Sequence, residues 1–269
     1  MLVKPDQIEE LSLAEMRALL HDWTIWARPA QLPPDDPRSS NHPTPGTPNP
    51  HWEYWLALAG RGWGKTRTGA EQVLRWVRTG YRRIAILAPT AADARDVATE
   101  GESGILTVAH PKERPLYEPS KRRLTFPNGA IATLFSAEEP ERLRGPQHDA
   151  IWMDEMAGWQ YPQETWDMAM FGLRLGTHPQ VFISTTPKPI PLIRNLISRA
   201  QKEPEKVVLT TGSTYENRAN LASTFFSQVA QYEGTRLGDQ ELHAKLIDPR
   251  ESGIVRPGWF HKYPHDFTL

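Results

Sequence analysis

The chain has 269 residues, of which 39% are hydrophobic and 23% charged, with a mean hydropathy of −0.56. This is the composition of a soluble globular protein, and no apolar run approaches the about 18 residues that a membrane span needs. The 31 Lys and Arg nearly balance the 32 Asp and Glu, so a global basic field for nucleic-acid binding is excluded. There is no cysteine, which excludes disulfides, thiolate metal sites and cysteine nucleophiles.

The first 51 residues are predicted to form a helix and a loop in front of the main domain. The start, MLVKPDQIEELSLAEM, carries acids where a secretory signal has basic and then apolar residues. From Ile8 to Trp26 apolar residues recur at helical spacing, which predicts one amphipathic helix within residues 1–30; it packs on its own core or, as the alternative, on a partner. Residues 31–51 are rich in Pro, Ser, Asn and Asp and are predicted to form an exposed loop.

Residues 52–212 are predicted to form an α/β domain. Short apolar runs suit strands that are buried on both faces of a parallel sheet, and they span residues 55–59, 83–88, 150–153, 181–185 and 206–210. Helix-length segments lie between several of them, at residues 65–79, 91–100, 165–175 and 192–201. This alternation predicts a mostly parallel central sheet with helices on both faces.

Two sections depart from the alternation of strands and helices. Pro127, Asn128 and Gly129 lie between alternating apolar segments within residues 122–137, which predicts an antiparallel β-hairpin insertion. Residues 213–250 are predicted to form a small helical lid subdomain, and residues 251–269 a linker or tail.

A phosphate-binding loop is predicted at AGRGWGKT, Ala59 to Thr66, because the segment follows a strand and opens a helix. Its glycines let backbone N–H groups surround phosphate oxygens, Lys65 reaches the terminal phosphates, and Thr66 can bind Mg²⁺. The common pattern starts with Gly, and Ala59 departs from it by one methyl group. Arg61 either adds a second positive charge or points to solvent. The nucleotide-binding residues expected here are Gly60, Arg61, Gly62, Trp63, Gly64, Lys65, Thr66 and Arg67.

Two adjacent carboxylates, Asp154 and Glu155, follow the buried strand at residues 150–153. Phosphoryl transfer uses two such acids in different roles. Asp154 is expected to hold Mg²⁺, and Glu155 to orient or deprotonate the attacking water. The nine histidines form no spacing typical of a metal site.

Hydroxyl and arginine side chains complete the set of candidates. Ser184, Thr185 and Thr186 lie at the end of the strand at residues 181–185, and the carboxyl ends of parallel strands line the ligand crevice. These hydroxyls can therefore contact a γ-phosphate, with ordinary turn chemistry as the alternative. Arg142 and Arg144 precede a Gly-Pro turn, where an arginine acts either as an arginine finger or as a plain surface residue.

Together these motifs resemble the ATPase domain of the large terminase subunit, the DNA-packaging motor of tailed bacteriophages. The resemblance depends on the order of the segments ARPAQLPP, GRGWGKT, TFPNGAIATLFSA, ERLRGPQHDAIWMDE, ISTTPKP and TYEN…YEGTRLGDQEL. It implies a P-loop NTPase of the additional-strand, catalytic-glutamate type that hydrolyses ATP with Mg²⁺.

The resemblance also implies roles for single residues. Ser184, Thr185 and Thr186 fall on the coupling motif of the family. Arg144 is the better positional match to an arginine that acts in trans around a ring, and Arg142 is the reserve. Gln31 matches a glutamine upstream of the loop that contacts adenine.

Partners follow from the same resemblance. The protein is expected to form a homo-oligomeric ring on the portal protein, with a monomer as the alternative in isolation, and to have no membrane partner. It is expected to interact with the small terminase subunit in the host-cell cytoplasm and to bind double-stranded DNA without sequence preference; Lys121, Arg122 and Arg123 are among the basic candidates for this. Large terminases carry an RNase H-type nuclease after the ATPase, for which the sequence up to Leu269 leaves no room, so DNA cleavage is not expected.

Two other functions stay open from the sequence. A helicase-like nucleic-acid remodelling ATPase shares the phosphate loop and the Asp154–Glu155 pair, although one with two core domains needs a second α/β core. A nucleotide-switched assembly scaffold shares the loop but does not translocate or turn over repeatedly. Bulk composition does not separate these two from a packaging motor.

Overall fold

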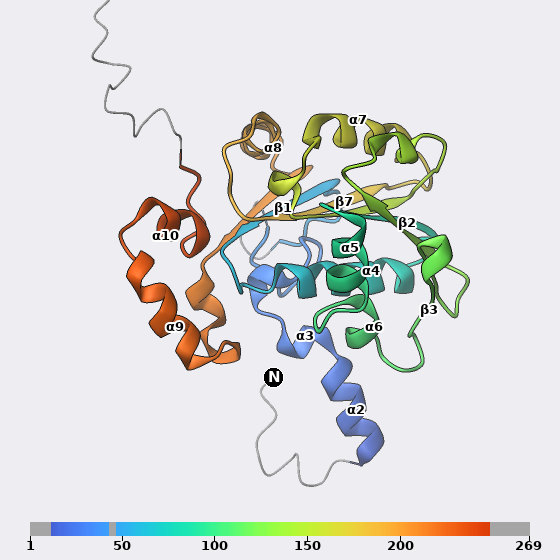
Figure 1. Ribbon diagram of the computed structural model, residues 1–269. Helices are drawn as coiled ribbons and strands as arrows, with labels where there is room; N and C mark the ends of the chain where they lie inside the picture. Colours follow the sequence, from blue (N-terminus) through green and yellow to red (C-terminus); the bar gives the residue numbers. More distant parts are fainter. Residues whose placement is uncertain (1–11, 43–46, 248–269) are drawn as a thin grey trace, which may run out of the picture.

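The computed structural model describes residues 12–42 and 47–247, and its centre is one eight-stranded sheet (Figure 1). The strands are β1 (Tyr54–Ala59), β2 (Arg83–Ala88), β3 (Leu116–Glu118), β4 (Arg123–Thr125), β5 (Ile131–Ser136), β6 (Ala150–Asp154), β7 (Gln180–Thr185) and β8 (Val207–Gly212). Their order in the sheet is β3-β4-β5-β2-β6-β7-β1-β8. Strand β7 therefore lies between β1 and β6 and pairs in parallel with both.

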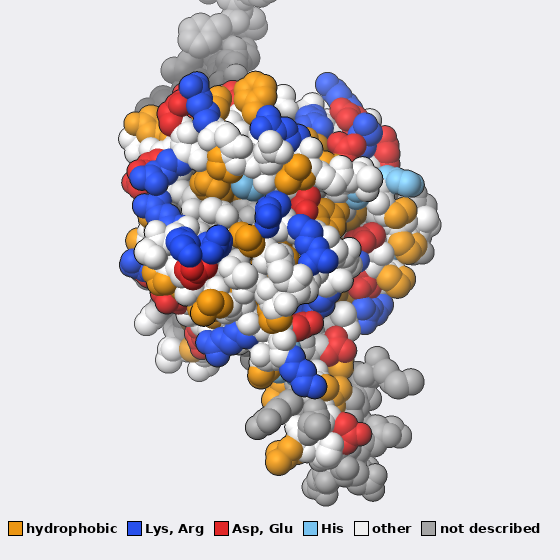
Figure 2. Space-filling model, turned by 90° about the vertical axis from the view of Figure 1, so that its right-hand side faces the viewer, with side chains coloured by type: hydrophobic (Ala, Val, Ile, Leu, Met, Phe, Trp, Pro, Cys, Tyr) orange, Lys and Arg blue, Asp and Glu red, His pale blue; other side chains and the backbone are white. Residues whose placement is uncertain are grey.

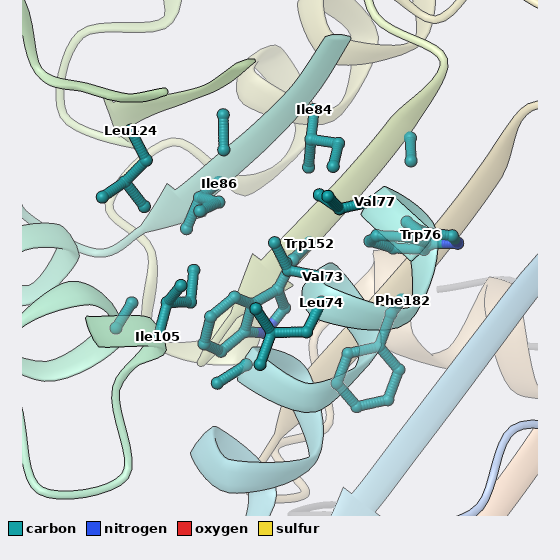
Figure 3. Packing of buried hydrophobic residues seen from close by; sticks show 14 of the residues in the cluster. Val73, Leu74, Trp76, Val77, Ile84, Ile86, Ile105, Leu124, Trp152 and Phe182 are labelled. Carbon is teal, nitrogen blue, oxygen red and sulfur yellow. The ribbon is translucent and has the colours of Figure 1, made fainter. Parts of the chain in front are cut away.

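The predicted strands of the α/β domain are confirmed, each within two residues at either end. They are buried on both faces because side chains alternate between two hydrophobic layers. On one face Trp55 packs in the same cluster as helix α4 (Lys65–Arg78). Trp152 and Phe182 of this cluster lie against α4 in Figure 3. On the other face Met153 and Ile183 pack with residues of helices α7 (Pro162–Gly172) and α8 (Pro191–Lys202). Helices thus cover both faces of a mostly parallel sheet, as predicted.

The helices differ from the prediction mainly at their ends. Helix α7 begins three residues before the expected start, because Pro162 fits the first turn of a helix. The segment predicted as one helix over residues 91–100 is a short turn of α-helix that continues as a π-helix. These two are α5 (Ala91–Asp93) and η2 (Ala94–Thr99), followed by α6 (Ile105–Val108) and the 3₁₀ helices η3 (Pro119–Lys121), η4 (Pro140–Leu143) and η5 (Met156–Gly158).

The predicted hairpin is present, but it is part of the main sheet. Strands β4 and β5 are antiparallel and joined through Pro127, Asn128 and Gly129, where Gly129 has a φ of +83°. Strand β5 also pairs in parallel with β2. The hairpin therefore extends the sheet at one end and is not a separate insertion.

The N-terminal helix prediction is wrong in its continuity. The described part is two helices, α2 (Leu13–His21) and α3 (Trp23–Trp26), and the beginning of the predicted helix lies outside the described residues. Asp22 ends the first helix and its carboxylate accepts the Thr24 N–H to start the second, a competition with helix continuation that is typical of Asp. The core contacts include a hydrogen bond between the His21 ring and the Val108 carbonyl.

The prediction that residues 31–51 are an exposed loop is also wrong for much of the segment. Gln31, Leu32, Ser39, Asn41 and Asn49 are buried. Their polar groups are satisfied inside the protein: the Asn41 amide donates to the Leu32 carbonyl at 2.7 Å, and the Asn49 amide donates to the Glu205 carbonyl at 2.8 Å. Hydrogen bonding therefore holds this segment on the domain together with the buried Leu32.

The section after the sheet is helical, as predicted, and its limits as a lid subdomain stay a prediction. It contains η6 (Thr214–Asn220), α9 (Ser223–Val229), η7 (Ala230–Tyr232) and α10 (Arg236–Glu241), drawn in orange to red in Figure 1. A further short 3₁₀ helix, η1 (Pro29–Gln31), precedes β1. Among the described residues, no helix is long and apolar enough to cross a lipid bilayer.

Candidate active site

The loop at residues 60–64 joins β1 to α4, and its shape requires glycine at two positions. Gly62 and Gly64 have φ values of +72° and +100°, in the left-handed region that side chains disfavour. A Cβ atom on Gly64 would also lie 2.7 Å from the Gln31 side-chain nitrogen. Both glycines are therefore needed for the chain to turn tightly into α4.

The carbonyl groups of the loop are held by segments on its outer side. Thr214 donates its hydroxyl to the Arg61 carbonyl at 2.7 Å, and the Asn217 amide donates to the Gly62 carbonyl at 2.7 Å. The Trp63 carbonyl accepts a hydrogen bond from the Arg28 guanidinium. Within the described chain, several loop amides make no backbone hydrogen bond, which leaves them free to bind an anion; these are the amides of Gly62, Gly64, Lys65 and Thr66.

Lys65 is held at the mouth of this loop. Its ammonium donates to the carbonyls of Ala59 at 2.9 Å and Gly60 at 3.2 Å, and to the Thr186 hydroxyl at 3.3 Å. Burial lowers the pKa of Lys65, and the charges of Glu155 and Asp154 oppose this shift. The ammonium thus lies between the loop and the two acids. There it can form an ion pair with an anion that binds to the loop amides.

Asp154 is the last residue of β6, and its carboxylate is buried. One oxygen, Oδ1, accepts the Ser184 hydroxyl at 2.7 Å, while Oδ2 has no hydrogen-bond partner in the described part of the chain. Burial raises the pKa of Asp154 to about 6, and the Ser184 hydrogen bond partly offsets this. A divalent cation at the free oxygen would relieve the cost of burying this charge.

Glu155 follows in a strained backbone conformation, with a φ of +47°. Such strain in a residue other than glycine costs of the order of 1 kcal/mol and is typical of functional sites. The carboxylate accepts the Thr186 backbone N–H at 3.1 Å. The turn therefore points Glu155 back toward the end of β7 and Lys65.

The three hydroxyl residues at the end of β7 connect the site. Ser184 donates to Asp154, and the Thr186 hydroxyl accepts from Lys65. Between them, Thr185 accepts the Ala157 backbone N–H at 3.0 Å. The strand between β1 and β6 therefore joins the lysine to both acids.

Gln31 lies against the phosphate loop although 28 residues separate it from Gly60. Its amide nitrogen is 3.3 Å from the Thr68 hydroxyl. Gln31 also lines a cavity of about 470 Å³ that runs along the outer side of α4. Trp23 and Gln72 line the same cavity, so it offers both an aromatic ring and amide groups beside the loop.

Three side chains predicted to bind nucleotide are engaged elsewhere. The Arg61 side chain is 73% exposed and forms an ion pair with Glu241 at 3.1 Å. Arg67 forms an ion pair with Glu71 at 2.8 Å, and the Trp63 side chain is fully buried. The Trp63 backbone is engaged as well, since its N–H donates to the Gly60 carbonyl and its carbonyl accepts from Arg28. Thr66 lies in the first turn of α4, as expected for a metal ligand.

The two candidate arginine fingers lie apart from the loop. Arg142 and Arg144 are 58% and 69% exposed, and they form ion pairs with Glu139 at 2.7 Å and Glu141 at 3.0 Å. In the described residues, neither guanidinium contacts the phosphate loop, Asp154 or Glu155. The structure therefore brings together the lysine, the acids and the hydroxyls, and leaves these arginines outside.

The sequence reasoning missed residues that hold the loop from outside. Arg28 donates to Trp63 and to the Asn217 side chain, the latter at 2.7 Å, and its guanidinium lies over the Trp63 ring at 5.1 Å. Thr214 is the other missed residue. The signal was present, since Arg28 precedes Gln31 in ARPAQLPP and Thr214 and Asn217 lie in TYEN, but one chain cannot show which residues of a motif touch the loop.

Strand order and loop define the class of the protein. A glycine-rich loop from β1 into α4, an acidic strand β6 and one strand between them form the fold of a P-loop NTPase with an additional strand. Residues 56–260 match the model of the family "Terminase large subunit, T4likevirus-type, N-terminal", and the chain belongs to this family. No curated protein matches the chain in sequence.

Solved structures agree with this assignment at the level of the fold. The large terminase ATPase domain of Thermus phage P74-26 has a TM-score of 0.57 at 14% identity, over 81% of this chain and 96% of that chain. The large terminase of the thermophilic bacteriophage D6E in complex with ADP gives 0.61 at 13% identity, over 86% and 53%. The HK97 bacteriophage large terminase gives 0.54 at 18%, over 74% and 47%. The chain thus spans about half the length of the D6E and HK97 proteins.

Proposed function

We propose that the protein hydrolyses ATP with Mg²⁺ and uses the energy to move double-stranded DNA into a viral procapsid. The observation that carries the ATPase proposal is the connection of Lys65, Asp154 and Glu155 through the hydroxyl residues of β7, next to a loop with free amides. Membership of the terminase family supports the packaging role.

The loop amides and Lys65 bind the phosphates of ATP in this proposal. Binding of ADP and ATP-γ-S by the D6E large terminase supports this assignment. The adenine base enters the cavity that Gln31 lines. The Gln31 amide bonds to Trp63 and Thr68 within the chain, so it has to turn to recognise the edge of the base. Arg61 and Arg67 are less suited to the phosphates, because their side chains pair with Glu241 and Glu71.

Mg²⁺ fits the oxygen atoms that the site presents. The free Asp154 oxygen and the Thr66 hydroxyl are hard ligands of the kind that Mg²⁺ prefers, with phosphate oxygens and water completing its shell. The described residues contain no cluster of three or more His, Cys, Asp or Glu that could hold a metal. When bound, Mg²⁺ neutralises charge on the phosphates.

Glu155 orients and deprotonates the attacking water, and Ser184, Thr185 and Thr186 respond to loss of the γ-phosphate. Because Thr186 contacts both Lys65 and Glu155, a change at the phosphates reaches the base through one residue. The charge that develops on the transferred phosphoryl group needs a further cation. Arg144 of a neighbouring copy supplies it, since it is exposed and does not reach the site of its own chain.

The motor acts in the host-cell cytoplasm as a homo-oligomeric ring on the portal protein, together with the small terminase subunit. It grips DNA phosphates without reading bases, which suits packaging of a whole genome. On the face at the β3 end of the sheet, Lys and Arg side chains lie among Asp and Glu (Figure 2). Lys121 and Arg123 there pair with Glu118, and Arg122 with Glu139, so DNA must compete with these acids.

The test of the ATPase proposal is the Glu155→Gln variant. We expect nucleotide affinity to be unchanged within about twofold and turnover to fall about a hundredfold to a thousandfold, because a positioned base contributes this much. Glu164→Gln, an exposed glutamate on α7, is the matched control and should retain full turnover. Near-normal hydrolysis by Glu155→Gln would remove Glu155 from the base role.

A further inference from the structure

A chain of two hydrogen bonds leads from the hydrophobic core to Asp154 in the candidate site. The Trp152 indole N–H donates to the Ser184 hydroxyl oxygen at 3.1 Å, and the Ser184 hydroxyl donates to Asp154 Oδ1 at 2.7 Å. Trp152 and Asp154 are two residues apart on β6 and therefore point to the same face of the sheet. Asp154 and Ser184 are direct neighbours across β6 and β7.

The direction of the Ser184 hydroxyl follows from its partners. A serine hydroxyl has one proton to donate and can accept at its oxygen, whereas an indole N–H only donates. With Trp152 donating to the oxygen, the Ser184 proton is directed to an acceptor. Two acceptors lie within reach, Asp154 Oδ1 at 2.7 Å and the Met153 carbonyl at 3.5 Å, and the shorter, charged partner is favoured.

The indole itself cannot turn away. Trp152 is fully buried in the cluster with Val73, Leu74 and Phe182 (Figure 3). Helix α4 passes so close that a Cβ atom on Gly69 would lie 2.1 Å from the Trp152 ring and 2.5 Å from its nitrogen. Packing therefore fixes the direction of the Trp152 indole N–H.

We propose that Trp152 is a positioning residue for the metal site: its indole N–H orients the Ser184 hydroxyl, which holds Asp154 with Oδ2 presented to Mg²⁺. This inference depends on the proposed function, because it assumes that Asp154 binds the metal of a metal–nucleotide complex. Outer hydrogen-bond partners of metal ligands typically change metal affinity by about tenfold to a hundredfold. A tryptophan in the core thereby acts on the active site without touching nucleotide.

The experiment uses the whole chain with Mn²⁺ as a probe of the metal site. Trp152→Phe keeps a smaller aromatic ring in the core but removes the N–H, so Ser184 is free to turn to the Met153 carbonyl. We expect Mn²⁺ binding in the presence of ADP, measured by electron paramagnetic resonance, to weaken about tenfold. Binding of a fluorescent ADP analogue in EDTA should not change, because the loop amides and Lys65 are untouched.

A matched control separates this effect from the loss of a buried hydrogen bond. Trp76 is also fully buried, and its indole N–H donates to Gln180 at 2.8 Å on the same side of the sheet but away from the acids. Trp76→Phe should lower the melting temperature by a similar amount and leave Mn²⁺ affinity at the wild-type value. Equal losses of Mn²⁺ affinity in the two variants would overturn the proposal.

Ser184→Ala tests the same link without changing the tryptophan. We expect it to weaken Mn²⁺ binding about tenfold, and the double variant with Trp152→Phe to bind no more weakly than Ser184→Ala alone. Unchanged Mn²⁺ affinity in Ser184→Ala, or multiplied losses in the double variant, would contradict the positioning role. If the wild-type protein itself binds no Mn²⁺ with ADP, the proposed function fails and this inference fails with it.

Discussion

The end of β7 and the loop that contains η4 differ in how their charged groups are satisfied. At the end of β7, Asp154, Glu155 and Lys65 are held by hydrogen bonds to buried hydroxyl and backbone groups of the same chain. At η4, Arg142 and Arg144 form only exposed ion pairs with glutamates three residues away. Such pairs contribute little stability and break readily. The first region is therefore preorganised within one chain, whereas the second is free to act on another molecule.

The largest effect is expected from the exposed region. Arg144→Ala should lower turnover at saturating ATP about a thousandfold or more, because an arginine finger contributes this much to phosphoryl transfer. Arg142→Ala, which is also exposed and paired with a glutamate, is the control and should stay within about twofold of wild type. The opposite result would make Arg142 the arginine finger. Full activity in both variants would show that neither arginine is the finger.

Mixing variants tests whether Arg144 acts across copies. In an equal mixture of Arg144→Ala and Glu155→Gln at high protein concentration, random assembly into a ring leaves about a quarter of the sites with both residues intact. Turnover should recover to about that fraction of the wild-type value. A mixture that remains inactive would show that Arg144 acts within its own chain.

The buried Asp154 at the end of β6 lowers the stability of the folded protein by an amount that depends on pH. Burial raises the pKa of Asp154 to about 6, above its ordinary value of 3.8. The folded protein therefore takes up this proton at a higher pH than the unfolded chain, and stability falls as pH rises between these two values. Asp154→Asn should be more stable than wild type at pH 7, by up to about 3 kcal/mol.

Urea unfolding at several pH values measures this difference. Below about pH 4 the gap between Asp154→Asn and wild type should close, because Asp154 is then protonated in both folded and unfolded chains. Asp167→Asn, an exposed position on α7, should differ from wild type by less than about 0.5 kcal/mol throughout. A gap that persists at low pH would mean that the asparagine stabilises by packing and not by removing a charge.

The tight packing of helix α4 on Trp152 is tested at Gly69. Alanine usually stabilises a helix relative to glycine by about 1 kcal/mol, but here the added carbon would overlap the Trp152 ring at 2.1 Å. We expect Gly69→Ala to destabilise the protein by about 2 kcal/mol in urea unfolding. Gly158→Ala is the control, since its new carbon would meet Glu155 at an ordinary 3.6 Å; stabilisation by Gly69→Ala would refute tight packing there.

The smallest effect is expected where η6 meets the phosphate loop. Asn217→Ala removes the hydrogen bond to the Gly62 carbonyl and the acceptor for Arg28. We expect ATP affinity to fall about fivefold, as the loss of about 1 kcal/mol predicts, in a titration with labelled nucleotide. Asn220→Ala removes a hydrogen bond to the Asn217 side chain but keeps the Asn217 amide that donates to Gly62, so it should lose less affinity than Asn217→Ala. Equal losses in the two variants would show that the Gly62 contact itself does not support nucleotide binding.

The fold was predictable where the local pattern and the final packing agree. The apolar runs of β1, β2, β6 and β7 are buried on both faces, so composition alone indicates them. The segment at residues 31–51 was mispredicted because side-chain hydrogen bonds of Ser39, Asn41 and Asn49 replace the apolar burial on which pattern reasoning depends. The helix break at Asp22 was missed for a similar reason, since apolar spacing continues across it.

In the candidate site, too, residues in local motifs were predictable and residues brought in by long-range contacts were not. Lys65, Asp154 and Glu155 stand in short motifs whose chemistry requires those residue types, and the sequence alone selected them. The contribution of Arg28, Thr214 and Asn217 was not predictable, because each meets the loop across a long separation in sequence. Nor could the sequence indicate that the Arg61 side chain turns to Glu241.

By itself, the sequence determined the class of fold and indicated the glycine-rich loop and the two acids as site candidates, because strand hydrophobicity and loop glycines are local requirements. Only the tertiary structure decided that β7 lies between β1 and β6 and so places Ser184 beside Asp154 and Thr186 beside Lys65. Strand order is set by how helices pack over both faces of the sheet, a property of the whole chain that no single segment encodes.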